Sequence, residues 1–186
     1  PQARNNGVAA AAAAGADWIF FLDADDIMDA NAFAAVAPSL AGHDAVWGAI
    51  AELAPDEESG VLREEQLPEI HGIEPLLSCD PYGLLQIGHF VKTAVALAHP
   101  FDTALDAGED FDYYLRVWAK HKCIKIPQPL FYNRRGMHST GPRSATGRQW
   151  RETVQKLVCK ACIAHEFHAD FTHRGVPLRF YIWNPY

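Results

Sequence analysis

The sequence predicts an α/β fold: a mixed sheet flanked by helices, with a further helix toward the C-terminal end. The apolar run Trp18–Leu22 follows an alanine-rich segment and ends at three acids, Asp23, Asp25 and Asp26. Short runs of bulky aromatic and β-branched residues are typical of strands covered on both faces of a sheet. Ligands of open α/β sheets bind beyond the carboxyl ends of the strands, so the three acids predict a site at that edge.

The size and charge of the chain limit the classes of protein to which it can belong. Its 186 residues, 49% of them hydrophobic, suffice for one compact core, which we divide into residues 1–145 and a helical extension over 146–186. No run approaches the ~18 apolar residues of a membrane span, and the first residues lack a signal-peptide pattern. We expect a cytoplasmic protein, at most peripheral to the inner membrane. A net charge of -7 argues against nucleic-acid binding.

Helices and strands alternate in the first part of the chain. Val8–Ala14 is almost pure alanine, which predicts a helix, and Gly15 follows where a left-handed C-terminal cap is expected. After the acids, Asp29 is expected to cap a short helix that Pro38 limits. Asp44–Leu53 alternates loosely and predicts a second strand.

The sequence predicts further strands and helices later in the chain, after a stretch without a clear pattern. Residues 55–60 are typical of a solvated loop, and the pattern weakens after them until Gly88–Lys92. An amphipathic helix is expected from Glu109, because apolar residues follow it at helical spacing. Beyond it we predict two short strands broken by prolines and a final helix, over Cys123–Ile126, Leu130–Tyr132 and Gln149–Phe167.

The acidic residues fall into two sites with different chemistry. Three neighbouring carboxylates repel one another unless a cation is present, and hard oxygen ligands favour Mg²⁺ or Mn²⁺. Such an ion takes one or two protein carboxylates and leaves positions for substrate phosphates. The separate pair Glu109 and Asp110 opens a helix, where a carboxylate can act as a general base. Arg4 and a loop with Arg134, Arg135 and His138 offer partners for phosphate.

Five segments of the sequence follow one another in an order that is typical of one protein family. The segments Ala3–Gly7, Ala13–Asp17 and Phe20–Asp26 resemble the "ARN-G … A-G … FLDADD" run of that family. Residues 100–112 resemble its "FD … L … GED" segment, and residues 132–139 resemble its "Y-R … HS" loop. One Asp-X-Asp triplet is weak evidence, but five segments in the family's order are specific. The chain thus resembles glycosyltransferase family 2, whose members have the GT-A nucleotide-sugar fold.

The resemblance implies sugar transfer with inversion from a nucleotide-diphosphate-sugar to an acceptor hydroxyl, aided by Mn²⁺ or Mg²⁺. The implied acceptor is a saccharide or a lipid-linked molecule, in bacterial surface-polysaccharide or glycolipid synthesis. The implied roles are donor binding for Arg4, Asp23, Asp25 and His138, metal binding for Asp25 and Asp23, positioning for Glu109 and catalytic base for Asp110. Asp26 is expected to cap the following turn instead.

The start of the chain departs from the family's pattern. Family members begin with a strand, a helix and a second strand that bind the nucleobase, whereas this sequence opens at Pro1, already beside the "ARN" motif. We therefore expect a piece of a longer protein or a remnant without a base pocket. Its sheet would have an unpaired edge that could recruit another chain, giving a homo-oligomer. A non-catalytic binding domain is the main alternative.

Two further alternatives rest on other motifs. A phosphatase of the haloacid dehalogenase type also places Asp-X-Asp after a strand, but a later strand-borne lysine with an acidic pair does not stand out. Cys159, Cys162, His165 and His168 suggest zinc, yet steps of three on one helix spread the side chains over half its circumference. We expect reduced thiols and surface histidines.

Overall fold

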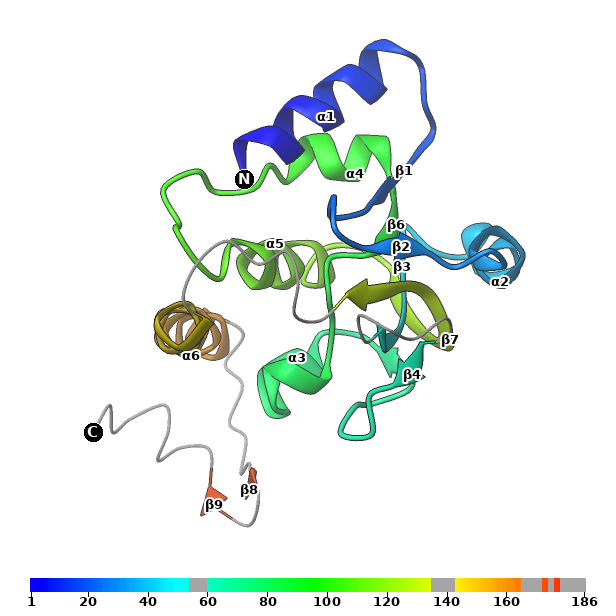
Figure 1. Ribbon diagram of the computed structural model, residues 1–186. Coiled ribbons are helices and arrows are strands. Elements are labelled where there is room, and N and C mark those ends of the chain that lie inside the picture. Colours follow the sequence, from blue (N-terminus) through cyan, green and yellow to red (C-terminus); the bar gives the residue numbers. More distant parts are fainter. Residues whose placement is uncertain (54–59, 135–142, 165–171, 174–175, 178–186) are drawn as a thin grey trace.

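The computed structural model describes residues 1–53, 60–134, 143–164, 172–173 and 176–177, with the backbone alone over 143–147, 172–173 and 176–177. In this part of the chain a mixed sheet lies between helices on its two faces (Figure 1). The helices are α1 (Gln2–Ala13), α2 (Ala32–Leu40), α3 (Glu74–Ser78), α4 (Thr93–Ala98), α5 (Glu109–Trp118) and α6 (Arg143–Ala164), with a 3₁₀ turn at Pro81–Gly83. The strands are β1 (Trp18–Phe21), β2 (Ile27–Met28), β3 (Ala45–Leu53), β4 (Val61–Leu62), β5 (Ile70–His71), β6 (His89–Lys92), β7 (Cys123–Arg134), β8 (Thr172–His173) and β9 (Val176–Pro177).

The main sheet has the order β1-β6-β3-β7-β2, with β4 beside β3 and β5 beside β7. Strand β6 runs antiparallel to both of its neighbours, and β3 runs parallel to β7. Strands β1, β3 and β7 therefore point the same way, and their carboxyl ends meet at one edge of the sheet. Asp23 follows β1 at this edge, and Arg134 ends β7 there.

Each face of the sheet has its own apolar core. Helix α2 covers one face, where Val36 packs with Val46, Phe90 and Leu130. Helices α3, α5 and α6 cover the other face together with α1 and α4, which lie side by side at the top of Figure 1. The sequence prediction of a mixed α/β sheet flanked by helices, with a C-terminal helix, is confirmed. The division predicted at 145 and 146 stays a prediction, and α6 spans these positions.

Prolines interrupt the helices and strands less than the sequence suggested. Pro38 lies inside α2, so the prediction that it limits the helix was wrong; the residue is exposed, and only one intrahelical hydrogen bond is lost near the helix end. The two strands predicted around Pro127 and Pro129 form the single strand β7. Its register against β3 shifts beside Gly48, where a Cβ would meet Gln128 O at 2.7 Å. This bulge accommodates prolines that lack an N–H donor.

Two further expectations about local structure need correction. Helix α1 begins at Gln2 rather than at Val8, although Gly15 does adopt the expected left-handed conformation, with φ 74°. Asp29 does not cap α2, because the N-cap of that helix is Asn31. The Asp29 carboxylate instead accepts a hydrogen bond from Asn31 N at 2.7 Å and so orders the turn before the helix.

Strand β1 is less buried than predicted. Phe21 is buried, but the three residues Trp18–Phe20 are only half-buried, and Leu22 is 41% exposed. The reason is position: in the described part of the chain β1 pairs with β6 on one side and has no strand on the other. Recruitment of another chain at this edge stays a prediction. No helix in the described ranges is long and apolar enough to cross a membrane.

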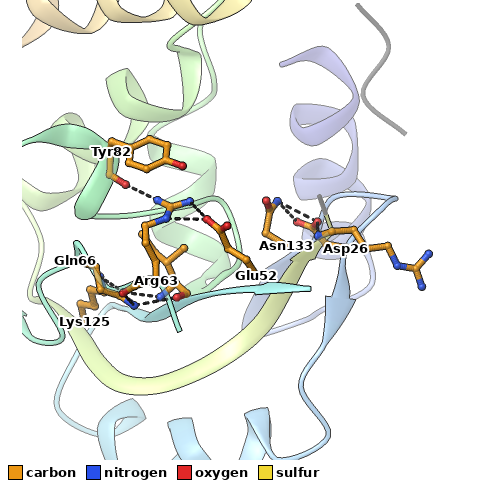
Figure 2. A network of polar contacts seen from close by, with 9 residues as sticks. Asp26, Glu52, Arg63, Gln66, Tyr82, Lys125 and Asn133 are labelled. Atoms are coloured by element: carbon orange, nitrogen blue, oxygen red, sulfur yellow. Dashed lines mark hydrogen bonds and ion pairs between the residues drawn. The ribbon is translucent and has the colours of Figure 1, made fainter. Parts of the chain in front are cut away.

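Side-chain hydrogen bonds fix the segment after β4, for which the sequence predicted no element. The Gln66 amide pairs with both backbone groups of Ile50 in β3, accepting from its N at 2.7 Å and donating to its O at 2.9 Å. Arg63 donates two hydrogen bonds to Glu52 and packs over the ring of Tyr82 (Figure 2). These contacts depend on residues far apart in sequence, so local patterns do not reveal them.

Candidate active site

The three acids form a tight turn, residues 23–26, which we call the acid turn. Asp26 N donates to Asp23 O at 3.0 Å, which closes it. Strand β1 enters the turn, and β2 leaves it to pair with β7, Ile27 opposite Tyr132. The acid turn is thus held between two strands at the carboxyl edge of the sheet, as the sequence predicted.

Arg4 connects the acid turn to the second acidic site. Its guanidinium donates to Asp23 Oδ1 at 2.6 Å and to Glu109 Oε1 at 3.1 Å. The side chains are partly buried, so these charge-assisted hydrogen bonds are screened less than surface ion pairs. Arg4 of α1 is therefore in direct contact with one acid from each predicted site, Asp23 after β1 and Glu109 at the start of α5.

Asn5 is a structural residue of this site that the sequence analysis missed. Its side-chain amide donates to Phe101 O at 2.9 Å and accepts from Phe101 N at 2.8 Å. This pair of bonds joins the first turn of α1 to the segment that leads to α5. The available signal was its place beside Arg4 in the "ARN" motif.

Asp110 lies one residue beyond Glu109 and is partly buried. Its Oδ1 accepts from its neighbour Phe111 N at 2.8 Å and from Trp150 Nε1 of α6 at 3.3 Å. Burial raises the pKa of the Asp110 carboxyl, and the charge of Glu109 raises it further, while these two donors and Arg4 oppose the rise. A desolvated carboxyl with a raised pKa is suited to accept a proton near neutral pH.

Asp26 joins the acid turn to β7. The sequence analysis had expected it to cap the following turn, and this expectation was wrong. Its Oδ1 accepts from Arg134 N at 3.1 Å and from Asn133 Nδ2 at 3.1 Å (Figure 2). Burial, opposed by these bonds, raises the pKa of Asp26 to about 6. Its role in holding β7 makes it a poor metal ligand, in agreement with its low rank in the sequence analysis.

Asp25 differs from the other two acids of the turn, because its carboxylate oxygens bond to none of the described residues. Asp23 is held by Arg4 and Asp26 by β7, whereas Asp25 makes no hydrogen bond or ion pair with the described residues. Among those residues, no three His, Cys, Asp or Glu side chains form a cluster that could hold a metal ion. The turn can therefore supply one or two carboxylates, a number that fits an ion completed by phosphate and water.

The other predicted residues lie elsewhere. His138 and Arg135 lie outside the described residues, as do His165 and His168. None of the four cysteines is in a disulfide, and burial raises the pKa of Cys159 and Cys162, which favours the protonated thiol. The strand-borne Lys125, which the sequence analysis overlooked, hydrogen-bonds to Gln66 and Leu84.

Comparisons with known proteins give a fold. No protein-family model matches the sequence, and no curated protein matches it. The structure is similar to that of S. aureus TarS residues 1–349 in complex with UDP-GlcNAc, with a TM-score of 0.58 and 16% identity over 88% of this chain and 50% of that one. For the complex of the same protein with UDP, the TM-score is 0.54 and the identity is 18%, over 88% of this chain and 48% of that one. This chain thus spans half or less of the length of these structures, and the likeness shows a GT-A-like fold.

Proposed function

We propose that the chain is part of a glycosyltransferase that moves a sugar from a nucleoside-diphosphate-sugar to an acceptor hydroxyl, with inversion. The Arg4 bridge carries the proposal, because it joins the acid that follows β1 to the helix that bears the partly buried Asp110. A donor site and a base are thereby held together. The likeness in fold to TarS, crystallised with UDP-GlcNAc and with UDP, supports a UDP-sugar as donor.

In the proposed reaction Asp110 is the general base. Its carboxylate takes the proton of the acceptor hydroxyl while that oxygen attacks the anomeric carbon from the face opposite the diphosphate. The bond from the anomeric carbon to the diphosphate oxygen breaks, and its electron pair leaves with the nucleoside diphosphate. Glu109, which pairs with Arg4, precedes the proposed base in the sequence and would orient the acceptor. We infer a saccharide or lipid-linked acceptor of bacterial surface-polysaccharide or glycolipid synthesis.

The acid turn supplies the donor side of this reaction. Asp25, with Asp23, would hold Mn²⁺ or Mg²⁺, which contributes positive charge against the diphosphate when bound. Arg4 adds a second positive group next to Asp23. A donor diphosphate would compete with the carboxylates for this guanidinium, whose planar fork suits phosphate oxygens.

Donor binding is tested by thermal unfolding with UDP-GlcNAc and Mn²⁺. A ligand at 100 times its Kd stabilises the folded state by about 2.7 kcal/mol, which raises the Tm of a chain this size by several degrees. We expect this rise in the wild type and in Asp112→Asn, because Asp112 pairs with Arg116 on α5. Asp25→Asn should abolish the manganese-dependent part. Equal Tm values with and without ligand would refute the proposed donor.

Catalysis is tested by release of UDP and by chemical analysis of the transferred sugar. Asp110→Asn keeps the shape of the side chain but cannot take a proton, so we expect it to bind UDP-GlcNAc and to lose transfer. Binding without any release of UDP from the wild type would favour the alternative, a non-catalytic nucleotide-sugar-binding domain. A phosphorylated Asp23 would instead indicate a phosphatase, although that carboxylate is paired with Arg4.

A further inference from the structure

Two adjacent tyrosines of α5 have buried hydroxyls without a partner. Tyr113 and Tyr114 are both fully buried, and neither hydroxyl makes a hydrogen bond within the described part of the chain. A buried hydroxyl that bonds to nothing lowers the stability of the fold, so its presence calls for a physical reason. Phenylalanine would fill the same space without that cost.

The surroundings of Tyr114 supply a reason. It follows Asp110 by four residues on one helix, so the two side chains share a face, and helical side chains lean back toward the preceding turn. Burial raises the pKa of Tyr114, and the charge of Asp110 is the next cause; Arg4, Asp23 and Glu109 also act on it. The phenol therefore lies within the electric field of the whole candidate site.

Tyr113 has a different environment. Its ring stacks on Phe101 with centroids 4.4 Å apart. Burial raises its pKa as well, but the charges that act on it are those of Cys123 and Arg116, and no acid of the candidate site is among them. The chain thus contains two neighbouring buried phenols, one beside the site and one remote from its acids.

The Asp110 carboxylate has capacity for another donor. An ionised carboxylate can accept about four hydrogen bonds. Two are described, from Phe111 N and Trp150 Nε1, and both go to Oδ1. A buried charge with few donors is costly, and a phenol O–H one helical turn away can reduce that cost.

We propose that Tyr114 is a positioning residue whose phenolic O–H donates a hydrogen bond, through one bridging water, to the Asp110 carboxylate and keeps it ionised. The role of Asp110 as base rests on the proposed function, but the hydrogen bond itself does not. A donor to the carboxylate favours its charged form. Removing the donor should raise the pKa of Asp110 beyond the rise that burial already causes.

The experiment measures that pKa through Trp150, whose indole N–H bonds to Asp110. The indole signal is followed by ¹H–¹⁵N NMR against pH in the wild type, Tyr114→Phe and Tyr113→Phe, and is identified by its loss in Trp150→Phe. Both tyrosine variants keep the buried ring and remove only a hydroxyl that bonds to no described residue, so both should fold. We expect the midpoint of Tyr114→Phe to rise by about one pH unit, the order of one hydrogen bond to a charged group, with Tyr113→Phe unchanged.

The outcomes separate this inference from the proposed function. A Tyr114→Phe midpoint equal to that of the wild type overturns the inference, as does an equal rise in Tyr113→Phe. If the wild type transfers sugar, the acid limb of its kcat/KM profile should move with the NMR midpoint. A shifted midpoint in a protein that transfers no sugar would leave the hydrogen bond established and would count against the catalytic role.

Discussion

Lys125 provides a stability test that does not depend on any assumption about function. Its ammonium is fully buried in β7 and donates to Leu84 O at 2.7 Å and to Gln66 Oε1 at 3.1 Å (Figure 2). No carboxylate pairs with it in the described part of the chain. Burial lowers the pKa of Lys125 from 10.5 to about 7, and the nearby charge of Arg63 contributes.

The sign of the effect on stability follows from where the proton is held. Between pH 7 and 10.5 the unfolded chain keeps the proton on Lys125 while the folded chain has lost it, so unfolding takes up a proton. The free energy of unfolding therefore rises with pH in this window, by about 1.4 kcal/mol for each pH unit. The full penalty, present below pH 7, is on the order of 5 kcal/mol for this shift.

Lys125→Met removes the charge and keeps an unbranched chain of similar length. Urea unfolding followed by tryptophan fluorescence gives the free energy of unfolding at each pH. We expect the variant to be more stable than the wild type at pH 6, and the difference to shift toward the wild type by about 2 kcal/mol between pH 7.5 and 9. Lys120→Met, at an exposed lysine, controls for loss of one positive charge.

A difference between Lys125→Met and the wild type that stays constant from pH 6 to 9 would refute the reasoning. The amine would then keep its proton in the folded protein at these pH values, and burial without a carboxylate would not have desolvated it.

Three further predictions concern the site. Arg4→Lys replaces a fork by a single ammonium, and loss of one charge-assisted hydrogen bond should raise the Kd for UDP-GlcNAc by about tenfold or more in a direct titration. Asn5→Ala removes both bonds to Phe101 and should lower the free energy of unfolding by about 1–3 kcal/mol in urea, whereas a change below 0.5 kcal/mol (roughly the scatter of surface substitutions) would contradict the joining role. Asp26→Asn keeps an acceptor oxygen for Arg134 N. In the wild type the pKa of Asp26 is about 6 in the folded state and 3.8 ordinarily, so the free energy of unfolding falls as the pH rises between these values. The variant should then be more stable above pH 6 by about 1–2 kcal/mol, allowing for partial exposure, and equal unfolding curves at pH 4 and 7 would contradict this.

The sequence predicted those helices and strands whose own residues show a helical or strand pattern of apolar side chains. Helix α5 has apolar residues at helical spacing, and β1 ends at its acids, so both were placed correctly. Strands β2, β4 and β5 have two residues each and exist because a partner strand lies beside them, so no local pattern could predict them. Strand β7 was predicted as two pieces, because its prolines suggested a break that the bulge opposite Gly48 makes unnecessary.

Within the site, residue types were easier to predict than contacts. The acids and Arg4 follow from their chemistry and their motif, but nothing in the sequence shows that one guanidinium bonds to both Asp23 and Glu109. Nor does it show that Asp26 faces β7, because that contact depends on the antiparallel pairing of β2 and β7.

The Arg4 bridge also bears on when the site can form during folding. Its two partners are 19 and 105 positions away along the chain. Contacts across such separations are made only after long loops have closed, a step that slows folding. During synthesis the acid turn leaves the ribosome well before Glu109 exists. Nascent or partly refolded chains should therefore have helical content before they acquire any affinity for a nucleotide-sugar, and nucleotide binding should appear with the slowest refolding phase.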